Sequence, residues 1–337
     1  MLVLLDEDHP RKNPFLVGLK TIDCFGTLTI LCSTLIVLLG LEFGGVNFAW
    51  NSVTVLCLIV FGALAFLLFL FIEYKVAKEP ILPLSLFTNL KSAALLTVCF
   101  AHGTVYISCA YFLPFYFQST LQALPVHSGI WFLGVTGPLA ATSLGATLYV
   151  QKTKRYSAVI RIGAVVQTIG FGLFITFPPY RSWVRIVLFQ ILVGMGVGAL
   201  FQSTLLALQN HLQQQQQKLP GSDIPDAVVV TVPSGTMAFT FVRQMSYGIS
   251  VVIGQLLLQS QMKPQLAALV KVGIAPDVAL ALTREDTVLA TPLIRTLEVG
   301  QQAVVREAIA RGLQRIWMLY VGVSGVGVVA SMFVGRE

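Results

Sequence analysis

The stretch Val53–Ile72 holds twenty residues without a charged side chain, and only Thr54 and Gly62 in it are not hydrophobic. An α-helix of that length crosses about 30 Å of hydrocarbon. Similar runs recur along the 337 residues, of which 11% are charged, against about a quarter in soluble domains. Because a helix satisfies its own backbone hydrogen bonds, the pattern predicts an all-α integral membrane protein embedded in a lipid bilayer.

About eight hydrophobic segments are long enough to span the membrane, with uncharged or sparsely charged interiors. Pro114, near the end of the third segment, predicts a kink or an early end of that helix. The predicted spans are Cys24–Phe43, Val53–Ile72, Ala93–Phe117, Gly129–Val150, Val159–Phe177, Ile186–Leu208, Thr236–Leu258 and Ile316–Val334.

Lysine and arginine near the span ends predict the orientation, because such residues gather on the cytoplasmic side. The leading segment and the second and fourth connections are basic, whereas residues 44–52 and 118–128 hold no Lys or Arg. We therefore expect the N- and C-termini in the cytoplasm. Arg181, Arg185 and the long basic connection 259–315 fall on the other side of the membrane. A connection of that length is translocated across the membrane largely regardless of its charge.

Two connections are long. Residues 209–235 contain the five consecutive glutamines Gln213–Gln217, which are typical of low-complexity linkers and predict a cytoplasmic loop without chemistry. Residues 259–315 form the predicted outer loop. Within it, Pro264–Leu282 and Val299–Leu313 carry patterns that favour short amphipathic helices on the outer surface, as an ordered cap.

Several classes of function are not supported. The five cysteines show no paired spacing, so we expect no metal site, and neither a phosphate-binding loop nor another cofactor motif occurs. The net charge of +7 comes from scattered basic residues, which argues against nucleic-acid binding. Gly322-Val-Ser324-Gly325 resembles the nucleophile motif of an intramembrane protease, but the required histidine neighbour is lacking. We expect no enzyme activity.

Ionisable residues inside a membrane are costly, so each is a candidate for function. No Asp or Glu lies within spans three to eight, which leaves no visible carboxylate proton relay. Arg243 lies about 10 Å into span seven at 1.5 Å per residue. It either holds an anion or carbonyl in a polar cavity or extends its guanidinium to the surface. His102 is either a packed, hydrogen-bonded histidine or part of a pathway.

Span six combines small and polar residues. Gly194 and Gly198 are four residues apart, which predicts a helix-packing face. Gln202 and Gln209 are two turns apart on one face, where they line a water-filled route or bond a neighbouring helix. In span three, Tyr106, Tyr111, Tyr116 and Gln118 form an aromatic and polar series, explained in part as an interfacial belt, from which Tyr111 and Gln118 are pathway candidates.

Five motifs, in order along the chain, resemble those of the fourteen-helix drug:proton antiporters of the major facilitator superfamily, especially fungal ones. They are EPILPLSLF at Glu79–Phe87, YFLPFYFQ at Tyr111–Gln118 followed by Ser128-Gly129, GMGVGALFQ at Gly194–Gln202 with Gln209, FVRQ at Phe241–Gln244, and Ile22-Asp23 with Gly44-Gly45.

The resemblance implies a lead segment at 1–23, two linker helices within 24–91, and a six-helix C-terminal half at 92–337. It implies proton-coupled efflux of hydrophobic small molecules, drugs or fungal toxins and secondary metabolites, with substrate bound near the midplane between two halves. Arg243, Gln202, Gln209 and Tyr111 would then line the cavity. The plasma membrane is the expected location, with a vacuolar or vesicle membrane as alternatives.

The sequence departs from the family pattern at several positions. Ser246, Tyr247 and Ser250 stand where glycines are usual, Lys154 replaces the glycine of Gly-Arg-Tyr, and Gly134 replaces a proline. The resemblance implies that the N-terminal half, which would carry most of the coupling acids, is missing from this chain. The alternatives are therefore a truncated, non-transporting remnant, a partner of another membrane protein such as a separate N-terminal half, or a self-associating pair of halves.

Overall fold

The computed structural model describes residues 24–44, 48–75, 82–217, 230–283 and 291–335. Among these residues, eight helices are long and apolar enough to cross a membrane, which confirms the predicted all-α membrane fold. The predicted lead segment 1–23 lies outside the described residues. The spanning helices are α2 (Cys24–Phe43), α3 (Val53–Lys75), α5 (Leu90–Ser119), α6 (Pro125–Thr153), α7 (Tyr156–Phe174), α8 (Trp183–Gln217), α9 (Val232–Met262) and α13 (Val299–Met332).

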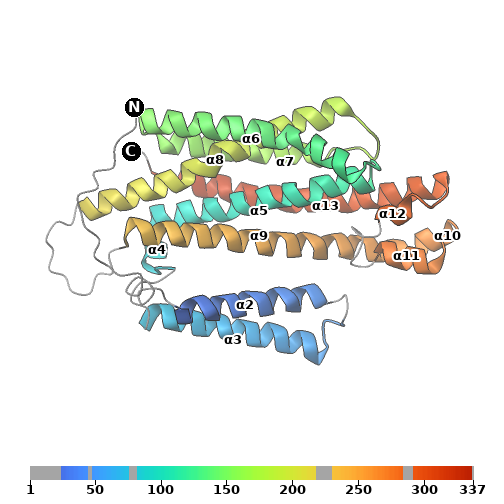
Figure 1. The fold of residues 1–337 in the computed structure, drawn as a ribbon, viewed down its shortest axis with the longest axis horizontal. Helices are drawn as coiled ribbons and strands as arrows, with labels where there is room; N and C mark the ends of the chain where they lie inside the picture. Colours follow the sequence, from blue (N-terminus) through green and yellow to red (C-terminus); the bar gives the residue numbers. More distant parts are fainter. Residues whose placement is uncertain (1–23, 45–47, 76–81, 218–229, 284–290, 336–337) are drawn as a thin grey trace.

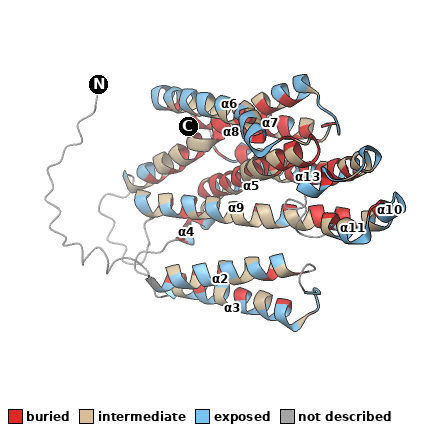
Figure 2. Ribbon diagram, turned by 45° about the vertical axis from the view of Figure 1, so that its right-hand side comes forward, coloured by how far each residue is buried: buried red, intermediate tan, exposed pale blue. Residues whose placement is uncertain are grey.

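Figure 1 shows α2 and α3 as a hairpin beside a bundle formed by α5 to α9 and α13. Within the hairpin, the Ser33 hydroxyl donates to the carbonyl oxygen of Gly62 at 2.9 Å. Both hairpin helices contact α9 of the bundle. Thr34 of α2 lies 3.7 Å from the sulfur of Met245, and the rings of Phe69 on α3 and Phe241 are 6.3 Å apart. Most of the remaining hairpin surface is apolar and exposed, as expected for helices that face lipid (Figure 2).

Glycines bring α8 close to both α6 and α7. A Cβ on Gly194 would clash with the carbonyl oxygen of Val135, and one on Gly198 with that of Leu139. On the opposite face, a Cβ on Gly196 would clash with the backbone of α7. The absence of side chains at these positions lets three helices pack backbone to backbone, which is how helices associate where no hydrophobic effect drives them.

One end of the bundle carries a cap, and we call it the cap end. The cap consists of η1 (Lys263–Gln265), α10 (Leu266–Lys271), α11 (Pro276–Thr283) and α12 (Thr291–Ile294). Leu269, Leu282 and Ile294 join the apolar core at this end. The opposite end holds the end of α13 and the short helix α4 (Ser85–Thr88) (Figure 1).

Two boundary predictions were wrong. Helix α8 continues to Gln217, so the glutamine run is helical, which the good helix propensity of glutamine allows. Of the two expectations at Pro114, the early end is not met, because helix α5 continues through Pro114 to Ser119, and Phe112 and Phe115 pack in the core.

The second error concerns Val299–Leu313, which is the first part of α13 and not a separate surface helix. Val305, Ile309 and Leu313 are buried, so a stripe that indicated a surface helix packs instead into the core of the cap end. By contrast, α10 and α11 form within the segment 264–282, where the sequence predicts short helices.

Candidate functional site

Helices α5, α8 and α9 bring a cation and several rings together near the middle of their lengths. The rings of Tyr106 and Phe201 are 5.8 Å apart, and those of Tyr106 and Tyr247 are 6.0 Å apart. His102 lies one turn from Tyr106 and meets Phe201 edge-on at 6.0 Å. With Arg243, these four residues form what we call the aromatic cluster.

The guanidinium of Arg243 packs against two rings. Its carbon lies 5.3 Å from the centre of the Phe201 ring and 5.6 Å from that of Phe239. Within the described ranges, the guanidinium makes no hydrogen bond and no ion pair with protein. Since a guanidinium carries five N–H donors, the half-buried Arg243 holds unused donors beside an aromatic surface, turned toward α8.

His102 is almost fully buried, with 3% of its surface exposed. Its Nδ1 lies 3.1 Å from the side-chain oxygen of Gln167 on α7. Because that oxygen can only accept, Nδ1 carries the proton in this arrangement. Nε2 is buried without a partner among the described residues. The contact with Gln167 is the arrangement expected of a packed, hydrogen-bonded histidine.

The two glutamines of α8 differ in their surroundings. Gln202 follows Phe201, is half-buried and makes no side-chain hydrogen bond in the described part of the chain. Gln209 donates from Nε2 to the Thr236 hydroxyl of α9 at 3.1 Å. Gln202 therefore adjoins the aromatic cluster, and Gln209 links two helices nearer the end opposite the cap.

Two further candidates lie away from the cluster. Tyr111 packs against Phe112 with ring centres 5.0 Å apart. Gln118 donates from Nε2 to the Ser128 hydroxyl at 2.9 Å, which ties α5 to α6. At 1.5 Å per residue, Gln118 lies about 18 Å along α5 from Tyr106, so it cannot share a small ligand with the aromatic cluster.

Comparisons with known proteins relate this helical arrangement to transport. The model of the fungal trichothecene efflux pump family matches residues 7–125. The MFS-type transporter ppz2 of Metarhizium majus is 35% identical over 336 residues, covering 100% of this chain and 55% of that protein. The efflux pump dotC of Dothistroma septosporum is 34% identical over 325 residues, covering 96% of this chain and 53% of that protein. The chain is thus similar, over its whole length, to fungal efflux pumps and transporters of the major facilitator type.

Efflux pump FUS6 of Gibberella fujikuroi is 31% identical over 254 residues, covering 74% of this chain and 43% of that protein. The chain thus spans about half the length of the efflux pumps it matches. Proteins of this family are transporters and not enzymes. The Ser324 hydroxyl lies 2.7 Å from that of Thr168 on α7.

The departures from the efflux-pump pattern on α9 are accommodated by α5. Gly103 lies directly opposite Ser246, and a Cβ on Gly103 would clash with the serine hydroxyl. Ser250 donates to the carbonyl oxygen of Thr104 at 2.7 Å, and Tyr320 donates to the carbonyl oxygen of Ser250 at 2.6 Å. The two serines therefore keep α5 and α9 close where the family usually has glycines.

Sequence reasoning missed Phe201 and Phe239 and noted Tyr106 only as part of a series. The signal for Phe239 was present, because it precedes Arg243 by four residues and so shares its helix face. Phe201 directly precedes the candidate Gln202, but a phenylalanine in a membrane helix is too common to stand out. Its role as a contact of Arg243 depends on the packing of α8 against α9.

Proposed function

We propose that this chain forms the two linker helices and the C-terminal half of a proton-coupled exporter of hydrophobic small molecules. The substrates would be drugs, toxins or secondary metabolites that carry a carbonyl or an anionic oxygen. The observation that carries the proposal is the Arg243 guanidinium, which lies against Phe201 and Phe239 and uses none of its donors on described residues.

This site suits such a substrate. Aromatic rings contact a hydrophobic body, while one cation fixes the orientation of an oxygen, which is the usual composition of small-molecule sites. The guanidinium also offers a stronger hydrogen bond than a neutral donor, because it is charged. Gln202 would add a neutral donor and acceptor beside the ring of Phe201. In this proposal Arg243, Gln202, Tyr106 and Tyr247 contact the substrate.

Proton coupling requires a group that gains and loses a proton. Helices α5 to α9 contain no Asp or Glu, so this chain supplies His102 as the titratable candidate inside the bundle. Its contact with Gln167 favours a packing role. We therefore assign the main coupling carboxylates to the part of the efflux pumps that lies outside the matched length.

We also propose a plasma-membrane location with both termini in the cytoplasm. Basic residues of the connections after α3 and α6 support this orientation: Lys75 and Lys91, then Lys152, Lys154 and Arg155. These connections lie at the end opposite the cap (Figure 1). A vacuolar or vesicle membrane, with the same cytoplasmic side, is the alternative.

The second candidate function is a non-transporting membrane protein that associates with another half or with a second copy. This second function is supported by the chain's coverage of only 55% of the Metarhizium majus transporter, because alternating access requires two halves to move against each other. The exposed α6, of which 6% of the spanning window is buried, offers a face for such an association.

An export assay in a pump-deficient yeast tests the proposal. The chain is expressed alone and joined to the N-terminal portion of the Metarhizium majus transporter, which we call the joined protein. We expect the joined protein to lower cellular accumulation of a fluorescent hydrophobic carboxylate. If both forms insert in the membrane and neither changes accumulation of any substrate in a broad panel, the exporter proposal fails and the non-transporting function is favoured.

A further inference from the structure

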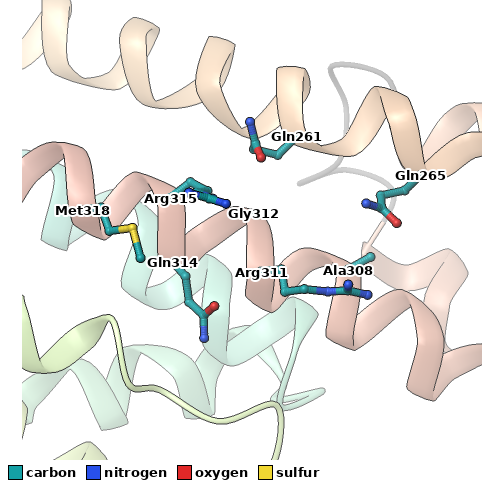
Figure 3. A pocket seen from close by; sticks show the side chains of 8 residues that line it. All are labelled: Gln261, Gln265, Ala308, Arg311, Gly312, Gln314, Arg315 and Met318. Atoms are coloured by element: carbon teal, nitrogen blue, oxygen red, sulfur yellow. The ribbon is translucent and has the colours of Figure 1, made fainter.

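A pocket of about 360 Å³ opens at the cap end between α9 and α13 (Figure 3). It lies about 27 Å along α9 from Arg243, at 1.5 Å for each of the intervening residues, and shares no residue with the aromatic cluster. The polar and long side chains that line it are Gln261, Gln265, Arg311, Gln314, Arg315 and Met318.

Helical spacing and one glycine create the pocket. Arg311 and Arg315 are four residues apart and therefore share a face of α13, as do Gln314 and Met318. Gly312 lies between the arginines, and a Cβ there would come within 3.0 Å of Leu258 on α9. The two helices consequently meet closely at Gly312, and the long side chains around that contact enclose the space.

The pocket is positively charged. Among the described residues, no acidic side chain lines it. Arg311 faces Glu307 at 3.8 Å, but both side chains are about 60% exposed, and such a surface pair contributes little and exchanges easily. Arg315 makes no hydrogen bond or ion pair with the described part of the chain. Two arginines with few protein partners thus line this pocket (Figure 3).

This arrangement selects for an oxyanion. Planar guanidinium groups bind phosphate oxygens through paired hydrogen bonds, and the amide groups of Gln261 and Gln265 supply neutral donors from the opposite wall. We expect the pocket to lie at the membrane surface, because Arg315 directly precedes the apolar segment Ile316–Val334. The exposed Met318 lies at the inner edge of the pocket, where an acyl chain would pass.

We propose that this pocket binds a phosphate group, carried by the headgroup of a phospholipid at the cap-end surface of the membrane. Inorganic phosphate shares the same chemistry and is the other source of the ligand. The inference does not depend on the transport proposal, because it concerns a separate surface of the bundle and a resident ligand.

The test uses the purified full chain and measures binding by native mass spectrometry and microscale thermophoresis. The probes are phosphatidic acid, phosphatidylcholine, diacylglycerol as the lipid without phosphate, and inorganic phosphate. The variant is Arg311→Gln with Arg315→Gln. The matched control is Arg185→Gln with Lys271→Gln, which removes the same charge from exposed cap-end residues that do not line the pocket.

We expect the wild-type chain to bind phosphatidic acid in preference to diacylglycerol. The pocket variant should weaken that binding about tenfold or more, the effect of losing two charge-assisted contacts, and the control by less than about twofold. If inorganic phosphate competes, the site takes free phosphate as well as headgroups. If it does not, the site is specific for lipid.

Equal binding of phosphatidic acid by the wild-type chain and the pocket variant would overturn the proposal. So would an equal loss in the control, which would indicate general attraction between charges, and so would equal binding of diacylglycerol. Arg315→Glu serves as a second, single-site variant. It should weaken the binding of phosphatidic acid relative to wild type, while the chain keeps the thermal stability of wild type.

Discussion

The guanidinium carbon of Arg243 on α9 lies 5.3 Å from the centre of the Phe201 ring on α8. The contact joins two helices, because it places a cation of α9 against a ring of α8. A cation over an aromatic ring contributes about 0.5–2 kcal/mol, more where water is excluded. The ring therefore fixes the direction in which the free donors of Arg243 point.

Replacing Phe201 with leucine removes the ring and keeps most of the apolar volume. In the joined protein, we expect Phe201→Leu to raise the substrate concentration for half-maximal export by about 2- to 30-fold, as the loss of a cation–π contact implies. Phe189→Leu on the same helix is the matched control, because Phe189 packs against Phe177 in the cap-end core and not against Arg243. Equal effects of the two changes would show that the ring acts only through packing.

His102 and Gln167 form a buried pair, so removing one partner leaves the other without a hydrogen bond. We expect Gln167→Leu to lower the temperature of aggregation in detergent, since a buried unpaired polar group costs about 1–3 kcal/mol. The double change His102→Leu with Gln167→Leu should restore most of that stability. If the double variant is stable and still exports, His102 has a packing role; if it is stable and inactive, His102 belongs to the transport pathway.

Lys154 adopts a left-handed conformation with φ of 59° at the C-terminal end of α6. This conformation costs a residue with a side chain about 1–2 kcal/mol and costs glycine little. Lys154→Gly should therefore raise the aggregation temperature, although most glycine substitutions lower it. Lys152→Gly, within the last turn of the same helix, should lower it. A lower aggregation temperature for Lys154→Gly would contradict the strained conformation of Lys154.

Gly198 contacts the backbone of α6, and Gly172 on α7 has open space where its Cβ would be. We expect Gly198→Ala to destabilise the chain by about 1–3 kcal/mol, the usual effect of adding volume to a packed interface. Gly172→Ala should leave stability unchanged or raise it by up to about 1 kcal/mol, because its Cβ meets no neighbour and alanine is the better helix former. Both variants are compared by aggregation temperature, and similar losses in the two would argue against close α6–α8 packing.

Sequence alone was sufficient for the fold class and for most helix positions. Uncharged runs such as Val53–Ile72 must cross the membrane as helices, because no other structure of that length satisfies its backbone there. Boundaries were harder. The glutamines Gln213–Gln217 have high helix propensity but the composition of a linker, and Val299–Leu313 has the pattern of both a surface helix and a partly buried one.

The candidate site was only partly predictable. Depth in the membrane pointed to Arg243 and His102, because a polar group in that environment needs a reason to be there. Their partners, Phe201 and Gln167, come from other helices, and single-sequence patterns do not report which helices touch. Gln118 and Gln209 were recognised by residue type but make hydrogen bonds away from the aromatic cluster.

The central claim is that Arg243 contacts the exported substrate, and the initial rate of export by the joined protein tests it most directly. Arg243→Ala is compared with Arg185→Ala, an exposed arginine at the cap-end start of α8, at equal amounts of protein in the membrane. We expect Arg243→Ala to reduce the rate about tenfold or more, which corresponds to about 1.4 kcal/mol, and Arg185→Ala to leave it within about twofold. Equal export rates for the two variants would contradict the claim.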